Sequence, residues 1–290
     1  MRRYYHIWNK SCLALIVLVV SSCYPDEKID VKQTKYDVDK TELDQYIEKN
    51  FRETFNMAIR YRYVDRYVAT GKRVTPPRLE VVKPMLDVIQ TFWIDPYLET
   101  TNGETFFRNH VPPEIILLGG YIYNANGTVT LGTADSGARI TFTNVNSLDP
   151  EDLDWRELQL HTVYHEFSHI VHQRYKLPTA FETITKAGYT SSGSWYNLTD
   201  EEALQRGFVS PYATSSPNED FAETVAFFLY DGNFDANFID QEAGCTTASC
   251  EADNAGKLYI AQKIAAIKDH YKKVTGIDLE ELRENIQAKL

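Results

Sequence analysis

His165-Glu166-Phe167-Ser168-His169 lies inside a segment that we expect to be helical. Residues four positions apart share one face of a helix, so the two imidazoles can bind the same ion. Glu166 lies beside them and can hold and deprotonate a water on that ion. Two histidines and a glutamate at this spacing are typical of zinc hydrolases. Such a pentapeptide also occurs by chance, so the rest of the chain must support this interpretation.

The helix that carries the pentapeptide has recognisable ends in the sequence. Asp149-Pro150-Glu151 provides a capping aspartate, a proline in the first turn and an acidic residue, which together predict a helix start. We expect the helix to run to about Tyr175 and to stop before Pro178.

Shorter patterns predict the other elements. Thr199 with Glu202 forms a capping box for a short helix that Gly207 can close. Strands followed by this helix and by further helices indicate an α+β domain over residues 40–290. We expect strands at 114–123, 128–132 and 138–145, a hairpin turn at Asn126-Gly127, and helices at 41–68, 84–96, 219–230, 252–273 and 278–289.

The composition fits a folded domain and argues against a nucleic-acid partner. The chain has 290 residues, and 43% of them are hydrophobic, which is enough for a buried core. Its formal net charge is −11, and no basic stripe is visible. An acidic chain without such a stripe is a poor candidate for nucleic-acid binding.

Residues 1–22 are expected to be a signal peptide. Basic residues precede an apolar stretch, 12–20, that is too short to span a bilayer. The stretch ends in Val20-Ser21-Ser22-Cys23, which resembles the bacterial lipobox. That resemblance implies cleavage before Cys23, lipid attachment to it, and an outer membrane lipoprotein on the periplasmic face or the cell surface. The alternative is an ordinary signal peptide with an incidental cysteine, and residues 23–39 are expected to be a tether.

Two cysteines remain in the chain beyond Cys23. Cys245 and Cys250 lie in a short polar segment with Gly, Thr and Ser. An exported protein meets an oxidising compartment, so we expect a disulfide between them. A second zinc site is the alternative, but no further Cys or His lies close by in the sequence.

A third metal ligand must come from outside the pentapeptide, because a catalytic zinc takes three protein ligands and leaves one position open. The metzincin pattern requires glycine at position 172 and histidine at 175, and this chain has His172 and Tyr175. Glu219 and Glu223 share one face of a later helix, so one can bind metal while the other orients a ligand imidazole. The alternative, two solvent-facing charges, fits poorly with so apolar a helix.

Three motifs together resemble a known family. They are similar to the zinc-binding metallopeptidases of Bacteroidetes, also described as substrate-import-associated zinc metallohydrolase lipoproteins. The resemblance implies a zincin-like fold with a small mixed sheet, zinc as cofactor, and a neighbouring outer-membrane TonB-dependent importer with its partner lipoprotein. The motifs are His165 to Gln173, Gly207-Phe208-Val209-Ser210-Pro211-Tyr212 and Asn218-Glu219-Asp220-Phe221-Ala222-Glu223.

A second resemblance assigns roles within these motifs. The spacing of Tyr212, Glu219 and Glu223 is similar to that in the catalytic domain of anthrax lethal factor. There the first glutamate of the pair binds zinc, and a tyrosine seven residues before it contacts the reacting substrate. Carried over, Glu219 is the ligand, Glu223 supports a ligand from behind, and Tyr212 assists catalysis as an electrophile.

The remaining candidates have structural alternatives. His172 can contact substrate or brace the site, or can be an ordinary polar residue near a cleft. His161 shares the face of His165, and we expect it to be structural. Among the aromatic residues, Trp195 and Tyr196 are the best candidates to contact a ligand because they lie in a Ser/Gly-containing loop, with a place in the core as an equal alternative.

The function that this pattern favours is a lipid-anchored, zinc-dependent metallopeptidase. In this hypothesis Glu166 activates the zinc-bound water, Tyr212 stabilises the oxyanion, and strand 138–145 receives an extended peptide as an added strand. The alternative is a zinc-containing binding lipoprotein that serves the importer without catalysis. A metal-free structural protein is a third possibility, which requires all three motifs to be accidental.

Overall fold

The computed structural model describes residues 40–124, 129–130, 132–134, 139–191 and 193–290. Within this range, Thr41–Leu290 form one compact unit. The expected signal peptide, residues 1–22, the tether, 23–39, and the Asn126-Gly127 turn lie outside the described residues, so these remain predictions. Among the described residues, none of the helices combines the length and the apolar character needed to cross a membrane.

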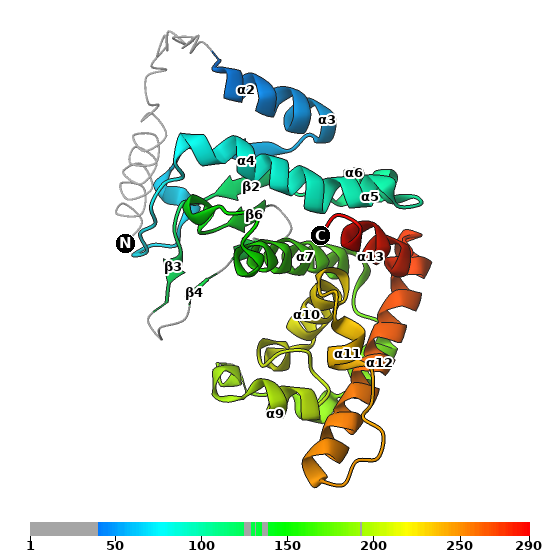
Figure 1. Cartoon of the computed structure of the whole chain (residues 1–290). Helices are drawn as coiled ribbons and strands as arrows, with labels where there is room; N and C mark the ends of the chain where they lie inside the picture. The colour runs from blue at the N-terminus through cyan, green and yellow to red at the C-terminus, as the bar shows by residue number, and fades with distance from the viewer. Residues whose placement is uncertain (1–39, 125–128, 131, 135–138, 192) are drawn as a thin grey trace, which may run out of the picture. The chain divides into compact units, whose positions relative to one another are not determined.

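A small mixed sheet and a larger set of helices confirm the α+β class (Figure 1). The four-stranded sheet has the order β1-β2-β6-β5, in which only β5 runs antiparallel to its neighbour. A second sheet pairs β3 with β4 in antiparallel fashion. The strands are β1 (Ala58–Arg60), β2 (Glu114–Leu117), β3 (Ile122–Tyr123), β4 (Val129–Thr130), β5 (Gly132–Ala134) and β6 (Arg139–Phe142).

The two central strands are buried because helices pack against them. Ile115 of β2 lies opposite Ile140 of β6, and both are fully buried. Phe142 of β6 meets Val88 of α4 (Leu79–Ile89) and Leu160 of α7 (Leu153–Tyr175) around one small internal space. The central strands and α7, which carries the pentapeptide, therefore share one core.

The N-terminal helix is shorter than expected. It consists of α2 (Glu42–Ile47), η1 (Glu48–Arg52) and α3 (Glu53–Phe55), and it ends where Asn56 adopts a left-handed conformation with φ 55°. The helix predicted over 41–68 is therefore wrong beyond residue 55. Ile59 fits helical spacing in the sequence, but the structure buries it in β1 beside β2, because pairing with a distant strand outweighs local periodicity.

The second helical run starts before Pro84 and continues through it. It comprises α4, η3 (Gln90–Ile94) and α5 (Asp95–Glu99), so the start predicted at residue 84 is wrong by five positions. Pro84 removes one backbone donor. Val82, Met85 and Leu86 are fully buried around it, and their packing compensates for that loss. The following helix, α6 (Gly103–His110), was not predicted, and the strand predicted over 114–123 is two short strands, β2 and β3.

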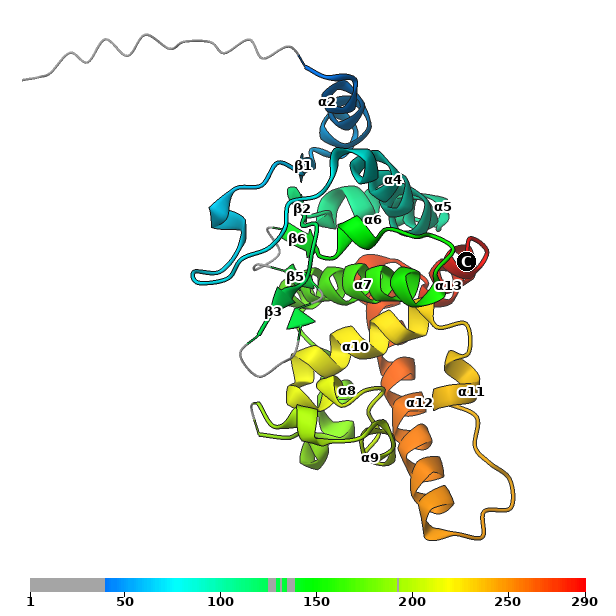
Figure 2. The same cartoon turned by 60° about the vertical axis from the view of Figure 1, so that its left-hand side comes forward.

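Three helices pack around the candidate centre. In both views α10 lies against α7, and α12 lies beside α10 (Figures 1 and 2). α7 begins at Leu153 with Asp152 as its cap, three residues later than Asp149, because Asp152 accepts the Asp154 and Trp155 amides while Asp149 caps only a preceding turn. The remaining helices are α8 (Thr179–Ile184), α9 (Asp200–Gln205), α10 (Pro217–Tyr230), α11 (Phe234–Phe238), α12 (Ala248–Thr275) and α13 (Leu279–Gln287). The 3-10 helices are η2 (Asp65–Tyr67), η4 (Val145–Ser147), η5 (Lys186–Gly188), η6 (Trp195–Asn197) and η7 (Tyr212–Ser215).

Local signals at the helix ends agree with the sequence patterns. Thr199 and Glu202 form the reciprocal capping box of α9, and Ser216 caps α10 through the Glu219 amide. A disulfide joins Cys245 to Cys250, whose Cα atoms are 5.5 Å apart, at the start of α12.

Candidate metal centre

His165 and His169 lie on one face of α7, one turn apart. Their Nε2 atoms are 3.0 Å apart, and both rings are largely buried, with side-chain exposures of 8% and 13%. At that separation the two nitrogens can share a single proton or cation.

Glu219 brings a carboxylate to the same point from α10. Its Oε2 lies 3.1 Å from the Nε2 of His165 and 3.1 Å from the Nε2 of His169. The three donor atoms therefore form a nearly equilateral triangle. A tetrahedral zinc with bonds of about 2.0–2.1 Å requires donor separations of about 3.3 Å, so these residues fit a metal with little movement.

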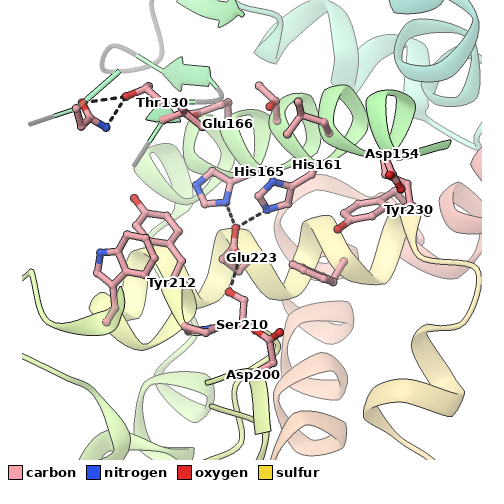
Figure 3. A pocket seen from close by; sticks show the side chains of 18 residues that line it. Thr130, Asp154, His161, His165, Glu166, Asp200, Ser210, Tyr212, Glu223 and Tyr230 are labelled. Carbon is pink, nitrogen blue, oxygen red and sulfur yellow. Dashed lines mark hydrogen bonds and ion pairs between the residues drawn. The ribbon is translucent and has the colours of Figure 1, made fainter. Parts of the chain in front are cut away.

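Glu223 holds the histidine cluster from behind (Figure 3). Its Oε1 lies 2.6 Å from the Nε2 of His161 and 2.7 Å from the Nδ1 of His165, although the latter contact is not aligned as a standard hydrogen bond. Its Oε2 accepts a hydrogen bond of 2.5 Å from the hydroxyl of Ser210. The carboxylate is almost completely buried, so it is fixed by all three neighbours.

Two overlapping clusters among the described residues can hold a metal, and both include His165. His161, His165 and Glu223 form the second cluster, where the contacts of 2.6 and 2.7 Å are shorter than the donor separations of about 3.3 Å around a tetrahedral zinc. The triangle that includes Glu219 has longer edges, which match metal ligation better. His165, His169 and Glu219 are therefore the better candidate set of metal ligands.

His172 braces the other ligand. Its Nε2 lies 2.8 Å from the Nδ1 of His169, and its ring is buried. Burial and the neighbouring His169 lower the pKa of His172 to about 4, so it is neutral at pH 7 and its Nε2 can accept a hydrogen bond from the Nδ1 of His169. The structure thus places His172 behind His169, a candidate ligand.

The charges at the centre are strongly coupled. Burial lowers the pKa of His165, but hydrogen bonds to Glu219 and Glu223 outweigh that effect and raise it to about 10. Burial raises the pKa of Glu219, and hydrogen bonds from His165 and His169 then bring it below its usual value. Without metal, the centre therefore holds a proton between imidazole and carboxylate.

A cavity of about 750 Å³ opens beside the centre. Glu166, His165 and Tyr212 all line it, together with Trp195 (Figure 3). Burial and the neighbouring Glu219 raise the pKa of the Tyr212 phenol above its usual value, so the phenol stays a proton donor. Tyr196 does not line the cavity and is exposed, unlike its neighbour Trp195.

The sheet order shows that the prediction of strand 138–145 as the one that receives substrate is wrong. β6 covers the core of the predicted segment 138–145, and it pairs with β2 on one side and β5 on the other. A strand that is hydrogen-bonded on both sides cannot accept a peptide as an added strand. Within the described sheet, β5 is the edge strand on this side.

A buried ion pair next to the centre escaped the sequence analysis. Lys263 of α12 and Asp220 of α10 are completely buried, with 2.7 Å between Nζ and Oδ2. Lys263 also donates to the carbonyl of Gly207 at 2.7 Å, and Tyr189 donates to Asp220 at 2.8 Å. Gly207 has φ +84°, which suits glycine, and a side chain there would collide with Tyr259.

This ion pair has a signal in the sequence that could have revealed it. Lys263 lies on the apolar stripe of α12 formed by Ile260, Ile264 and Ile267, which are all buried. A lysine within such a stripe requires a buried carboxylate partner. Ser210 has no comparable signal, because its role depends on where Glu223 lies.

Comparison with known proteins agrees with this geometry. A family model described as "Putative zinc-binding metallo-peptidase" matches residues 35–280. A crystal structure from Bacteroides caccae ATCC 43185, described with the same words, is similar with a TM-score of 0.68 and 28% sequence identity, covering 85% of this chain and 90% of that one. None of the curated proteins matches.

Proposed function

This chain belongs to the zinc-binding metallo-peptidase family, and from that membership we propose that it hydrolyses peptide bonds at the centre formed by α7 and α10. Zinc is the metal by which both the family and the similar crystal structure are described. The observation that carries the proposal is the triangle of His165, His169 and Glu219, which adjoins a cavity lined by Glu166 and Tyr212. A zincin-like active site has these parts.

Zinc, when bound, lowers the pKa of a coordinated water from about 15.7 toward 7 and polarises a carbonyl oxygen. Glu166 takes a proton from the attacking water and passes it to the leaving amine. Tyr212 keeps its phenol proton and donates a hydrogen bond to the oxygen on which negative charge develops. Both side chains line the cavity, so a substrate within it can reach them.

The supporting residues hold the two ligand rings in orientation. Glu223 accepts from His161 and Ser210 and contacts His165, while His172 contacts His169. Such outer contacts fix the tautomer and direction of a ligand imidazole. We further propose that the edge of β5, in place of β6, aligns an extended peptide.

The location of the protein forms a separate part of the proposal. Val20-Ser21-Ser22-Cys23 supports a lipid on Cys23 and an outer membrane lipoprotein beside a TonB-dependent importer. Metabolic labelling with radioactive palmitate tests this. Label in the wild type that disappears in Cys23→Ala supports the anchor, and an unlabelled wild type contradicts it.

The hydrolase proposal is tested by comparing wild type with Glu166→Gln. Zinc content is measured on both purified proteins, and both are incubated with a peptide library. We expect about one zinc per chain in each protein and cleavage by the wild type alone, reduced at least about 100-fold in the variant. Zinc in both proteins with cleavage by neither would favour the binding lipoprotein instead.

A further inference from the structure

The cavity continues from the metal centre along a groove between α7 and α10 (Figure 3). The residues of α7 that line it recur every three or four positions, as do those of α10, so each helix presents one continuous face. Asp154 and His165 are separated by about 16 Å of helix, at about 1.5 Å per residue. The α7–α10 groove is formed by Asp154, Glu157, Leu158, His161 and Thr162 of α7 and by Phe227 and Tyr230 of α10.

The middle of the groove is apolar and aromatic. His161 packs against Phe227 and Tyr230, with ring centroids 5.6 and 5.9 Å apart. Leu158 contributes an aliphatic wall. A long, unbranched aliphatic chain fits such a passage, and aromatic faces also attract cations.

The far end of the groove is negatively charged. Asp154 and Glu157 line it and are exposed, and neither forms an ion pair with a Lys or Arg among the described residues. The described residues that line the whole cavity include five carboxylates and no Lys or Arg. Burial and the negative charges of Glu223 and Glu157 raise the pKa of Tyr230, so the field of these carboxylates reaches its phenol.

The groove is apolar in its middle and negatively charged at its far end. From this arrangement we infer that the groove selects a peptide with a lysine or arginine side chain near the scissile bond. The aliphatic stem lies along Leu158, Phe227 and Tyr230, and the cationic head lies at Asp154 and Glu157. This inference rests on the proposed function for the position of the reacting bond. The free amino terminus of a peptide also carries a positive charge, and the test distinguishes this amino group from a lysine or arginine side chain.

The test measures binding, so it does not depend on turnover. Zinc-loaded Glu166→Gln protein is titrated with fluorescent hexapeptides that carry one lysine, at each position in turn, or norleucine in its place. Each peptide is used both N-acetylated and with a free amino terminus. We expect a Kd about 5- to 10-fold lower for the lysine peptide at the favoured position, given exposed ion pairs and a cation–π contact. The difference should shrink in 0.5 M NaCl because exposed charges are screened.

Variants identify the responsible carboxylates. Asp154→Asn/Glu157→Gln, made in the Glu166→Gln background, should remove the preference for lysine over norleucine. Glu151→Gln, which changes an exposed acid before α7 that does not line the cavity, is the matched control and should retain it.

Two outcomes overturn the inference. One is equal affinity for lysine and norleucine peptides at every position, and the other is a preference that appears only in peptides with a free amino terminus. Failure of the proposed function gives a different pattern, in which the binding preference persists although the wild type cleaves neither lysine nor norleucine peptides.

Discussion

α10 places three carboxylates within two turns, and its two sides give them different partners. Glu219 and Glu223 face α7, where they meet the imidazoles of His161, His165 and His169. Asp220 faces α12 and forms an ion pair there with Lys263, and both side chains are completely buried.

The two sides of α10 differ in whether the positive charge beside the carboxylate can be replaced. On the α12 side, a fixed cation of the chain compensates the carboxylate, and the pair joins α10 to α12. On the α7 side, the compensating charge is a proton on imidazole, which a metal can replace. Neighbouring residues of one helix thus divide into a structural side and a chemical side.

The largest effect is expected when the structural side is broken. Lys263→Met leaves Asp220 buried without its cation and should lower the free energy of unfolding by about 3–5 kcal/mol. Urea denaturation of the zinc-loaded protein measures this. A loss below about 1 kcal/mol would show that the pair does not hold α10 to α12.

A double variant provides the control. Asp220→Leu/Lys263→Met removes both charges and should recover most of that stability, because replacing a buried ion pair by apolar residues is often neutral. Recovery will be incomplete, since Tyr189 and the Gly207 carbonyl lose their partners.

Substitutions on the chemical side should change the affinity for zinc more than the free energy of unfolding. Glu219→Gln replaces a charged ligand by a neutral amide and should weaken zinc binding by more than about 100-fold, which exceeds the loss typical of an outer contact. Competition with a chromophoric chelator measures the affinity. Unchanged affinity would show that another residue is the third ligand.

Glu223→Gln tests the same side one turn further along the helix. The amide keeps the shape of the carboxylate but removes the charge that faces His161 and His165, so zinc affinity should fall by about 10- to 100-fold. The same chelator competition applies, with Ser210→Ala as a milder comparison. A loss as large as that in Glu219→Gln would show that Glu223 binds the metal directly.

A further prediction concerns the proton that the metal replaces. The pKa of His165 is raised to about 10 in the metal-free protein. Zinc binding between pH 7 and 9 should therefore release close to one proton, and zinc affinity should rise at most tenfold per pH unit. Calorimetry in buffers of different ionisation enthalpy measures the release, and a value near zero would contradict the assignment.

Stability of the metal-free protein should show the opposite trend. A histidine whose pKa is raised on folding stabilises the fold fully below its unfolded value of about 6.5 and loses that contribution as pH rises toward 10. Urea denaturation in the presence of a chelator should therefore give lower stability at pH 9 than at pH 6.5. The slope is at most about 1.4 kcal/mol per pH unit for one proton.

Local signals predicted the chemical side well because its residues are defined by helical spacing. His165 and His169, and Glu219 and Glu223, are pairs four residues apart, and the capping box of Thr199 and Glu202 consists of short-range hydrogen bonds. Prediction was weaker where distant segments decide. The segment around Ile59 depends on pairing of Ala58 with Glu114, which lies 56 residues later (114 − 58). The pairing of β6 with β2 joins Glu114 to Arg139, which are 25 residues apart (139 − 114).

By itself, the sequence determined that two imidazoles share a face of one helix and two carboxylates share a face of another, because helix geometry converts spacing into direction. Only the tertiary structure decided that these faces meet, that Asp220 faces Lys263, and that β5 forms the edge of the sheet. Those outcomes depend on the packing of α7, α10 and α12, and the energies of such long-range contacts cannot be read from local spacing.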